Sequence, residues 1–340
     1  MIQEFTEKKA ELILGGNVKI PKGFDVGVRV SRSTAGPGAG NPSVVFAFGG
    51  CRVKKAISYD DGEFDLVERD KRLSLYRGGS PFLDDVRIQP VAFHCPEQAF
   101  FNLDQRCIYH CVYCNSPFLG RDTWKDLNDD KILADIASMP GVVCAVALTS
   151  GVFGSVGETV GRMVSCIRKI RAAYPDMPVG VEPYVDDRKQ IDSLREAGAT
   201  EIKINCEAAT SEVFSKVCPD LDYGNIFKML AYAVEVFGKG HVASNLIYGF
   251  GEDNADVIAR MEMLAKMGVA PGLRALKINP CNRRRIEDAV GTVEPNTPER
   301  VLSLAKEQKR IMAEYGIDTR TFRTMCFECT CCDIVPFRDI

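Results

Sequence analysis

Three closely spaced cysteines near residue 110 are the residues of this chain best suited to chemistry. The pattern Cys107-x3-Cys111-x2-Cys114 places three thiols on one short segment, directly after the apolar run at residues 99–103. Thiolates at this spacing can converge on one metal centre from a loop, and a preceding strand would hold that loop rigidly. Structural zinc normally has four closed ligands, so an open triad favours a reactive iron-sulfur centre. His110 is a less favoured fourth ligand.

A second group of cysteines follows the last predicted helix: Cys326, Cys329, Cys331 and Cys332. These thiols lack the second, separated pair of a zinc ribbon, so we predict an auxiliary iron-sulfur cluster, with a zinc knuckle as the alternative. Cys51 or Cys95 could complete this site, and His94 is a further candidate. The remaining cysteines are expected to be packed or incidental thiols: Cys144, Cys166, Cys206, Cys218 and Cys281.

Composition indicates a folded protein without a nucleic-acid footprint. The chain has 340 residues, of which 26% are charged and 46% hydrophobic, which suits one large domain with a smaller partner. The net charge is -3 and the basic residues are dispersed, so we expect no nucleic-acid partner. The local run at residues 283–285 favours a solvated helix start over an anion site.

The cysteine content indicates metal ligation in a reducing compartment. No stretch approaches the 18 apolar residues of a membrane span, and the first residues lack the apolar core of a signal peptide. We therefore expect a cytoplasmic protein that does not contact the membrane. Because a reducing cytosol keeps thiols free, the 14 cysteines favour metal binding over disulfides.

The N-terminal part of the chain, residues 1–95, is expected to form a small accessory β-rich region. Turn-rich pieces separate its short β-like runs: residues 26–30, 44–48, 64–67 and 73–76. The Gly-rich piece at residues 35–42 lacks the Lys-Ser/Thr ending of a phosphate-binding loop, so an ordinary loop is favoured there.

From residue 99 onward the pattern alternates strands with helices. The predicted strands are residues 99–103, 142–148, 179–181, 201–205, 242–248 and 273–278. The predicted helices are residues 131–138, 159–174, 187–197, 223–237, 253–267 and 298–315. This succession predicts an α/β fold, a partial (β/α)6 TIM-like barrel with its functional groups at the carboxyl ends of the strands. We assign residues 96–285 to the barrel, and residues 286–340 to a C-terminal helix and cysteine-rich tail.

The first three cysteines, with aromatic Tyr113 before the last of them, resemble the radical S-adenosylmethionine (SAM) superfamily over about residues 100–280. The resemblance implies a 4Fe-4S cluster whose open iron binds the amine and carboxylate of SAM. An electron from this cluster would cleave SAM to a 5'-deoxyadenosyl radical. Tyr113 is an expected cofactor contact.

Polar residues at the predicted strand ends match the superfamily in order. Thr149 and Ser150 stand where the superfamily usually has a Gly-Gly-Glu-like segment that contacts the SAM amine, so this chain departs from the pattern there. Glu182 resembles the residue that contacts the ribose. A solvated residue before Pro183 is the alternative interpretation of Glu182.

The later strands resemble lipoyl synthase, and biotin synthase is a looser match. Asn205 and Glu207 would contact the ribose or amine of SAM, while Gly249 and Gly251 would let the backbone approach the adenine. Glycines at such positions also end strands in tight turns. Two further candidate contacts close the last predicted strand: Arg274 and Asn279.

This resemblance implies sulfur insertion into an unactivated C-H bond, with the auxiliary cluster as the sulfur source. The N-terminal Cys-x4-Cys-x5-Cys motif of common lipoyl synthases is missing, whereas the tail supplies cysteines. The arrangement resembles a subunit of the two-component archaeal lipoyl synthases, which act on a protein-bound octanoyl chain. Expected partners are an octanoylated lipoyl-carrier protein, a possible second radical SAM subunit and an electron donor such as ferredoxin.

Two other functions remain open at this point. A radical SAM methylase or another enzyme of cofactor biosynthesis would use its second cluster for electron transfer or substrate binding. A non-catalytic assembly protein would hold structural metals at both cysteine groups.

Overall fold

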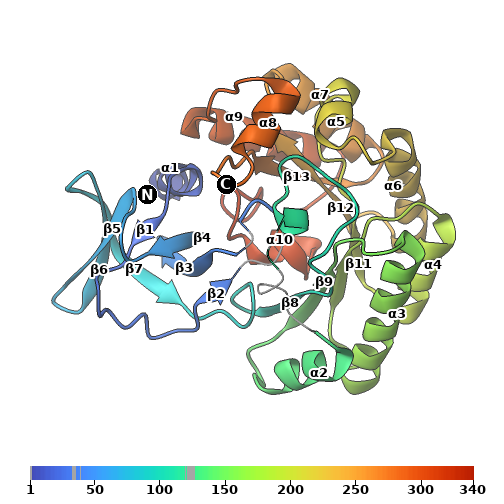
Figure 1. The fold of residues 1–340 in the computed structure, drawn as a ribbon, viewed down its shortest axis with the longest axis horizontal. Helices are drawn as coiled ribbons and strands as arrows, with labels where there is room; N and C mark the ends of the chain where they lie inside the picture. Colours follow the sequence, from blue (N-terminus) through green and yellow to red (C-terminus); the bar gives the residue numbers. More distant parts are fainter. Residues whose placement is uncertain (1, 33–35, 39, 119, 121–126) are drawn as a thin grey trace.

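The computed structural model describes residues 2–32, 36–38, 40–118, 120 and 127–340. A small β-rich unit lies beside a larger α/β unit, and the C-terminal tail runs between them (Figure 1). Parts of the Gly-rich piece lie outside the described residues. Within the described part of the chain, no helix is long and apolar enough to cross a membrane.

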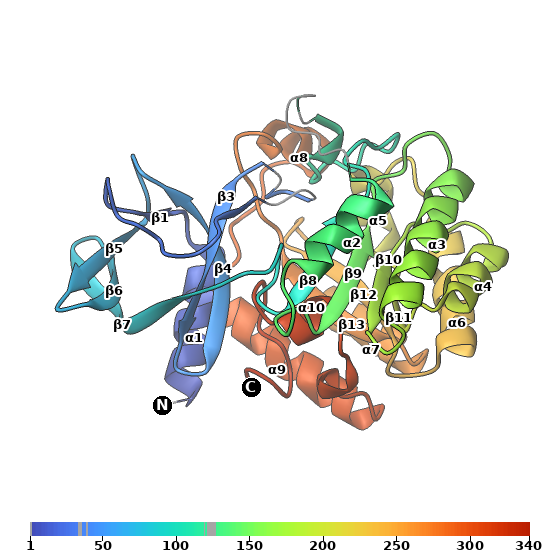
Figure 2. The ribbon, with the colours of Figure 1, turned by 90° about the horizontal axis from the view of Figure 1, so that it is seen from below.

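The N-terminal unit is a sheet that closes on itself, because β3 pairs with both β4 and β7. Its elements are α1 (Ile2–Leu14), β1 (Val18–Lys19), β2 (Ser31–Arg32), β3 (Pro42–Phe48), β4 (Cys51–Ser58), β5 (Phe64–Arg69), β6 (Arg72–Arg77) and β7 (Ser80–Gln89). Hairpin turns with positive φ join β3 to β4 at Gly49 and Gly50. Helix α1 packs against β4, as Figure 2 shows.

The predicted β-rich character of this unit is confirmed, although five of its elements were not predicted, among them the two-residue strands β1 and β2. Residues 26–30 form no strand, whereas α1, β4 and β7 do form. Strand β4 alternates buried and half-buried positions, but Lys55 occupies one of the buried ones. A buried lysine hides the apolar period on which strand prediction depends.

The larger unit is the predicted partial barrel. Its six strands are parallel and follow chain order: β8 (Gln98–Asn102), β9 (Ala145–Thr149), β10 (Val179–Glu182), β11 (Glu201–Lys203), β12 (Val242–Tyr248) and β13 (Ala270–Ala275). No pairing joins β8 to β13 among the described residues, so the barrel is open between these two edges. Strand β13 starts at Ala270, three positions before the predicted start at residue 273. The observed strand includes Pro271, which is tolerated because β13 is an edge strand.

Helices cover the outside of this sheet. They are α2 (Asp129–Ala137), α3 (Val156–Ala173), α4 (Arg188–Ala197), α5 (Ser211–Val217), α6 (Tyr223–Phe237), α7 (Asn254–Lys266) and α9 (Pro298–Glu314). Helix α8 (Arg283–Val290) lies above the strand ends. Side-chain caps fix where several of them begin; Asp187, for example, forms a capping box at α4. The expected boundary at residue 285 falls inside α8, and α9 packs against α7 and β13.

The C-terminal tail closes the amino-terminal end of the barrel. Short helix α10 (Met325–Cys329) lies at its centre in Figure 1. Met325 N donates to Gln98 Oε1 (2.7 Å) at the start of β8, and Thr324 N donates to Glu201 Oε2 (3.0 Å) at the start of β11. A Cβ at Gly180 would collide with Thr324, so a glycine in β10 lets the tail approach the sheet.

Candidate iron-sulfur and SAM sites

The first three cysteines lie on the loop after β8, at the carboxyl end of the barrel strands. Backbone hydrogen bonds tie this loop to two neighbouring segments. Ile108 N donates to Val152 O (2.8 Å) after β9, and Val112 N donates to Val217 O (2.9 Å) at the end of α5. The loop is therefore held at the barrel rim, where functional groups of such folds gather.

Helix α8 secures the same loop from another side. Arg285 Nη2 donates to Cys114 O (3.0 Å), and its Nε donates to Val112 O (3.2 Å). Asn282 Nδ2 donates to Tyr113 O (3.0 Å). The other two arginines of the basic run pair with carboxylates on their own helix. The run is a helix start, as expected, but Arg285 also holds the cysteine loop.

The three thiols form a donor set suited to iron. Burial raises the pKa of the Cys107 and Cys114 thiols, and bound iron would take the place of their protons because the thiolate is the ligand. His110 points elsewhere: its Nδ1 lies 3.1 Å from Asp220 Oδ2, and its side chain is 63% exposed. The structure therefore gives no support to His110 as a fourth ligand.

A fourth thiol lies against this loop. Cys218, the residue after α5, hydrogen-bonds the Cys111 thiol, and its Sγ is 3.7 Å from Tyr113 Oη. Within the described residues no group of three or more His, Cys, Asp or Glu side chains is arranged to hold a metal ion. Support for a cluster comes instead from the thiol chemistry, because iron-sulfur clusters bind cysteine thiolates.

The ends of β10 to β12 bring a polar network into the barrel. Glu182 Oε2 pairs with Lys203 Nζ (2.9 Å), and Glu182 Oε1 accepts from Asn205 Nδ2 (3.0 Å). Asn205 Oδ1 accepts from Asn245 N (3.2 Å). The interpretation of Glu182 as a solvated residue is wrong, since its side chain is only 17% exposed. Glu182 and Asn205 lie together, as a shared cofactor contact requires.

Glu207 connects this network to the cysteine loop. Its backbone has φ 64°, and Ile247 N donates to Glu207 O (3.0 Å), so the residue is fixed beside β12. Burial raises the pKa of Glu207 to about 7, although a hydrogen bond with Tyr113 acts in the opposite direction. Tyr113 therefore points under the loop toward Glu207 and Cys218, and is itself buried.

The residues at the end of β9 and directly after it make local contacts. Thr149 Oγ1 donates to Glu182 O (3.3 Å), and Ser150 Oγ donates to Gly151 O (2.7 Å). A Cβ at Gly151 would overlap Arg106 O in the cysteine loop. This segment therefore packs directly against the loop, with both hydroxyl protons already bound.

Gly249 and Gly251 form a tight turn after β12. Their φ values are 109° and 112°, which confirms the turn interpretation. A Cβ at Gly249 would meet the Asn296 side chain, whereas one at Gly251 would meet nothing within 4 Å. Only Gly251 leaves room for a ligand to approach.

The two candidates from the last strand separate in space. Asn279 Nδ2 donates to Pro37 O (2.7 Å), and Asn279 N donates to Asn282 Oδ1 (2.8 Å). It thus fastens the Gly-rich piece to the start of α8. Arg274 lies lower in the barrel, paired with Asp333 of the tail. The grouping of Arg274 with Asn279 is wrong, because β13 ends at Ala275 rather than at residue 278.

Four cysteines from two distant segments meet at the β8 edge of the open barrel: Cys95, Cys329 and Cys331 are buried in one cluster, and Cys332 packs against it together with Phe100 of β8. Burial lowers the pKa of Lys54 in β4, and four thiols around its amine act in the opposite direction: Cys332, Cys95, Cys329 and Cys331. Hydrogen bonds with Cys331 and Cys95 hold the pKa of Cys329 well below its usual value. Four thiols beside a half-buried amine suit a cluster with a net negative charge. We call them the second cysteine group.

Two predicted members lie outside the second cysteine group. Cys326 is hydrogen-bonded to Lys203 Nζ at 3.3 Å, inside the barrel. The groups that shift the pKa of Cys51 are Asp339 and Lys9, and no other thiol is among them. Cys95 is thus the N-terminal cysteine that the structure brings to the cysteines of the tail. His94 hydrogen-bonds Lys54 Nζ (3.0 Å), and burial lowers the His94 pKa to about 3.

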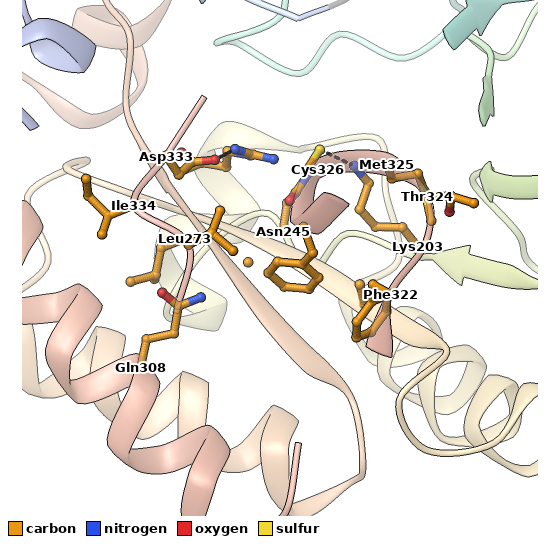
Figure 3. A pocket seen from close by; sticks show the side chains of 15 residues that line it. Lys203, Asn245, Leu273, Gln308, Phe322, Thr324, Met325, Cys326, Asp333 and Ile334 are labelled. Carbon is orange, nitrogen blue, oxygen red and sulfur yellow. Dashed lines mark hydrogen bonds and ion pairs between the residues drawn. The ribbon is translucent and has the colours of Figure 1, made fainter. Parts of the chain in front are cut away.

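A cavity of about 20 Å³ lies between the strand ends and the tail. Figure 3 shows Lys203 and Cys326 pointing toward each other across one side of it, with Asp333 on the other side. Leu273 and Phe322 supply apolar walls. The barrel interior therefore joins the Glu182 network above to the tail below.

Sequence reasoning missed several residues of both sites. Lys54, Lys203 and Asn245 gave no motif, since a single cation or amide in a strand or at its end is common. Arg285 belonged to a run that was predicted only as a solvated helix start. Cys218 was expected to be incidental; only its placement beside Cys111 singles it out.

Comparisons with known proteins agree with the geometry of the barrel. Residues 102–264 match the family model described as the Radical SAM superfamily. A biotin synthase from Cutibacterium acnes (strain DSM 16379 / KPA171202) is 31% identical over 173 residues, or 48% of this chain and 46% of that protein. The match thus spans just under half the length of this curated relative.

Two solved structures share the fold. The FeFe-hydrogenase maturase HydG from Carboxydothermus hydrogenoformans gives a TM-score of 0.52 at 16% identity, over 64% of this chain and 51% of that chain. Methylornithine synthase also gives 0.52, at 14% identity, over 66% and 70% of the two chains. At such identities the likeness concerns the fold alone.

Proposed function

Since the barrel of this chain belongs to the radical SAM superfamily, we propose that the protein uses a 5'-deoxyadenosyl radical to insert sulfur into an unactivated C-H bond. The observation that carries this proposal is the second cysteine group, four thiols packed together at the open side of the barrel. The similarity of this chain to a biotin synthase supports sulfur insertion as its type of reaction. The proposed substrate is an octanoyl chain carried on a protein, as for a lipoyl synthase subunit.

The bound groups would supply the radical and the sulfur. With one electron from a donor such as ferredoxin, the first cluster and SAM would supply the 5'-deoxyadenosyl radical that removes hydrogen from the substrate. The second cluster would supply the sulfur and take up the one electron left over when the C-S bond forms.

The residues of the chain would position these groups. Cys107, Cys111 and Cys114 would hold the first cluster on the rigid loop. Glu182 and Asn205 would orient SAM at the ends of β10 and β11, where their hydrogen bond fixes both side chains. The buried interior would exclude water from the radical.

A direct test supplies the reconstituted protein with reductant, SAM and an octanoylated lipoyl-carrier peptide, with and without a candidate second radical SAM subunit. Mass spectrometry of the peptide should reveal a gain of sulfur, together with 5'-deoxyadenosine in solution. An unmodified or methylated peptide, with another substrate accepted, rejects the proposal.

A second candidate is an electron-transfer role for the second cluster. The four thiols favour it, because a cluster with a cysteine on every iron is fully ligated. Cys329→Ala and Cys331→Ala distinguish the two functions. Sulfur insertion must stop in these variants while SAM cleavage continues, whereas a reaction that needs only electrons remains possible with an external reductant.

A further inference from the structure

The N-terminal unit lies outside the family match, which begins at residue 102, yet it contacts the second cysteine group. Lys9 in α1 is fully buried. Its Nζ donates to Thr330 O (2.6 Å) and pairs with Asp339 Oδ2 (2.7 Å). Thr330, which separates Cys329 from Cys331, has φ 55°. The lysine therefore holds the turn that aims these two thiols.

Strand β4 holds the same turn on both flanks. Arg52 Nη2 donates to Glu328 O (3.0 Å), and Lys54 N donates to Cys331 O (2.9 Å). Lys54 Nζ also donates to His94 O (3.1 Å), next to the fourth thiol. Both segments that carry the second cysteine group are thus fixed to the N-terminal unit by directed hydrogen bonds.

We infer that the N-terminal unit is the scaffold of the second iron-sulfur site, with Lys9 as its positioning residue. The inference rests on the second cluster of the proposed function. Without the Lys9 amine, the Thr330 carbonyl loses a charge-assisted donor in a place that water does not reach. The turn would relax, and Cys329 and Cys331 would no longer face Cys95. The first cysteine loop is fixed by α5 and α8 instead, so its cluster is independent of Lys9.

The test compares two variants of the full chain, reconstituted anaerobically. Lys9→Met combined with Asp339→Asn removes the amine without leaving an unpaired buried charge, and an asparagine oxygen can still accept from Val335 N. Lys8→Met, at the partly exposed neighbour on the same helix, is the control. Iron and sulfide are counted, and the electron paramagnetic resonance of the reduced protein is recorded with and without SAM.

We expect the double variant to lose about half of its iron and sulfide, while SAM still perturbs the remaining signal and 5'-deoxyadenosine is still formed. Lys8→Met should keep both clusters. Retention of both clusters by the double variant would overturn the inference, as would equal loss of both clusters with a lowered unfolding temperature. If the wild-type protein holds two clusters but inserts no sulfur, only the proposed function is rejected. If it holds a single cluster, the proposed function and the scaffold inference are both rejected.

Discussion

The two cysteine groups of this molecule are built in different ways. The first is a single loop at the barrel rim, whose thiols are near one another in the sequence. The second joins Cys95 to Cys329, Cys331 and Cys332 around Lys54, at the meeting point of the N-terminal unit, the open barrel edge and the tail. A site carried by one loop needs anchors for that loop alone, whereas a site from two distant segments needs a scaffold that holds both.

The largest effect is expected from the first group. Cys111→Ala should reduce 5'-deoxyadenosine formation to background, at least about a thousandfold, because the radical source is lost. Chromatography of the reaction mixture measures this. Cys166→Ala, at a buried thiol in α3, is the matched control and should behave as wild type. Substantial activity of Cys111→Ala would mean that neighbouring Cys218 can replace the lost ligand.

A second substitution separates the two groups. Cys95→Ala should remove about half of the iron and all sulfur insertion while SAM cleavage continues. Cys51→Ala and Cys326→Ala are the controls and should keep the full iron content, because neither thiol lies in the second group. Iron analysis and product mass spectrometry give the answer. Loss of iron from Cys51→Ala instead would contradict the assignment of ligands.

A smaller effect concerns Glu207, the half-buried acid beneath the first group. Burial raises the pKa of Glu207 in the folded protein from 4.5 to about 7. Below pH 4.5 the carboxyl is protonated in both the folded and the unfolded states, and its contribution to stability is fully present. This contribution is lost as the pH rises to about 7 and stays lost above it. Relative to Glu207→Gln, the wild-type protein without cluster or SAM should lose about 3 kcal/mol of unfolding free energy over this range. Denaturant unfolding at a series of pH values measures this loss. If the unfolding free energies of wild type and Glu207→Gln change with pH in parallel, the pKa assignment is refuted.

The smallest effect tests the contact between Cys218 and Cys111. A thiol that donates to a cluster ligand stabilises the reduced, more negative state. Cys218→Ala should therefore lower the midpoint potential of the first cluster by about 40 mV, equivalent to about 1 kcal/mol for one electron. A redox titration followed by electron paramagnetic resonance measures the shift. An unchanged potential would show that the two thiols do not interact once iron is bound.

Much of the barrel was predictable, because its elements follow regular periods. Helix α6 has the predicted bounds, Tyr223–Phe237, since its apolar period and its Asp222 cap agree. In the N-terminal unit, β4 was missed because a buried lysine interrupts its apolar pattern. Local patterns report local structure, and they do not reveal a closed sheet whose order differs from chain order.

The same limit applies to the sites. The first triad could be recognised from its spacing alone, whereas the choice of Cys95 over Cys51 depends on how β4 and the tail pair. Cys326 belongs to the same sequence cluster as Cys329, but α10 turns it toward Lys203 instead. Lys9 could not be predicted at all, since its partners Thr330 and Asp339 lie at the other end of the chain.

The central claim is that the second cluster is the sulfur source. The most direct measurement reconstitutes the protein with isotopically heavy sulfide, removes the excess, and adds reductant, SAM, the octanoylated peptide and any required second subunit, all with sulfur of natural abundance. We predict that sulfur in the modified peptide carries the heavy isotope, and that Cys95→Ala yields none. Sulfur of natural abundance in the product, or the same product from Cys95→Ala, would contradict the claim.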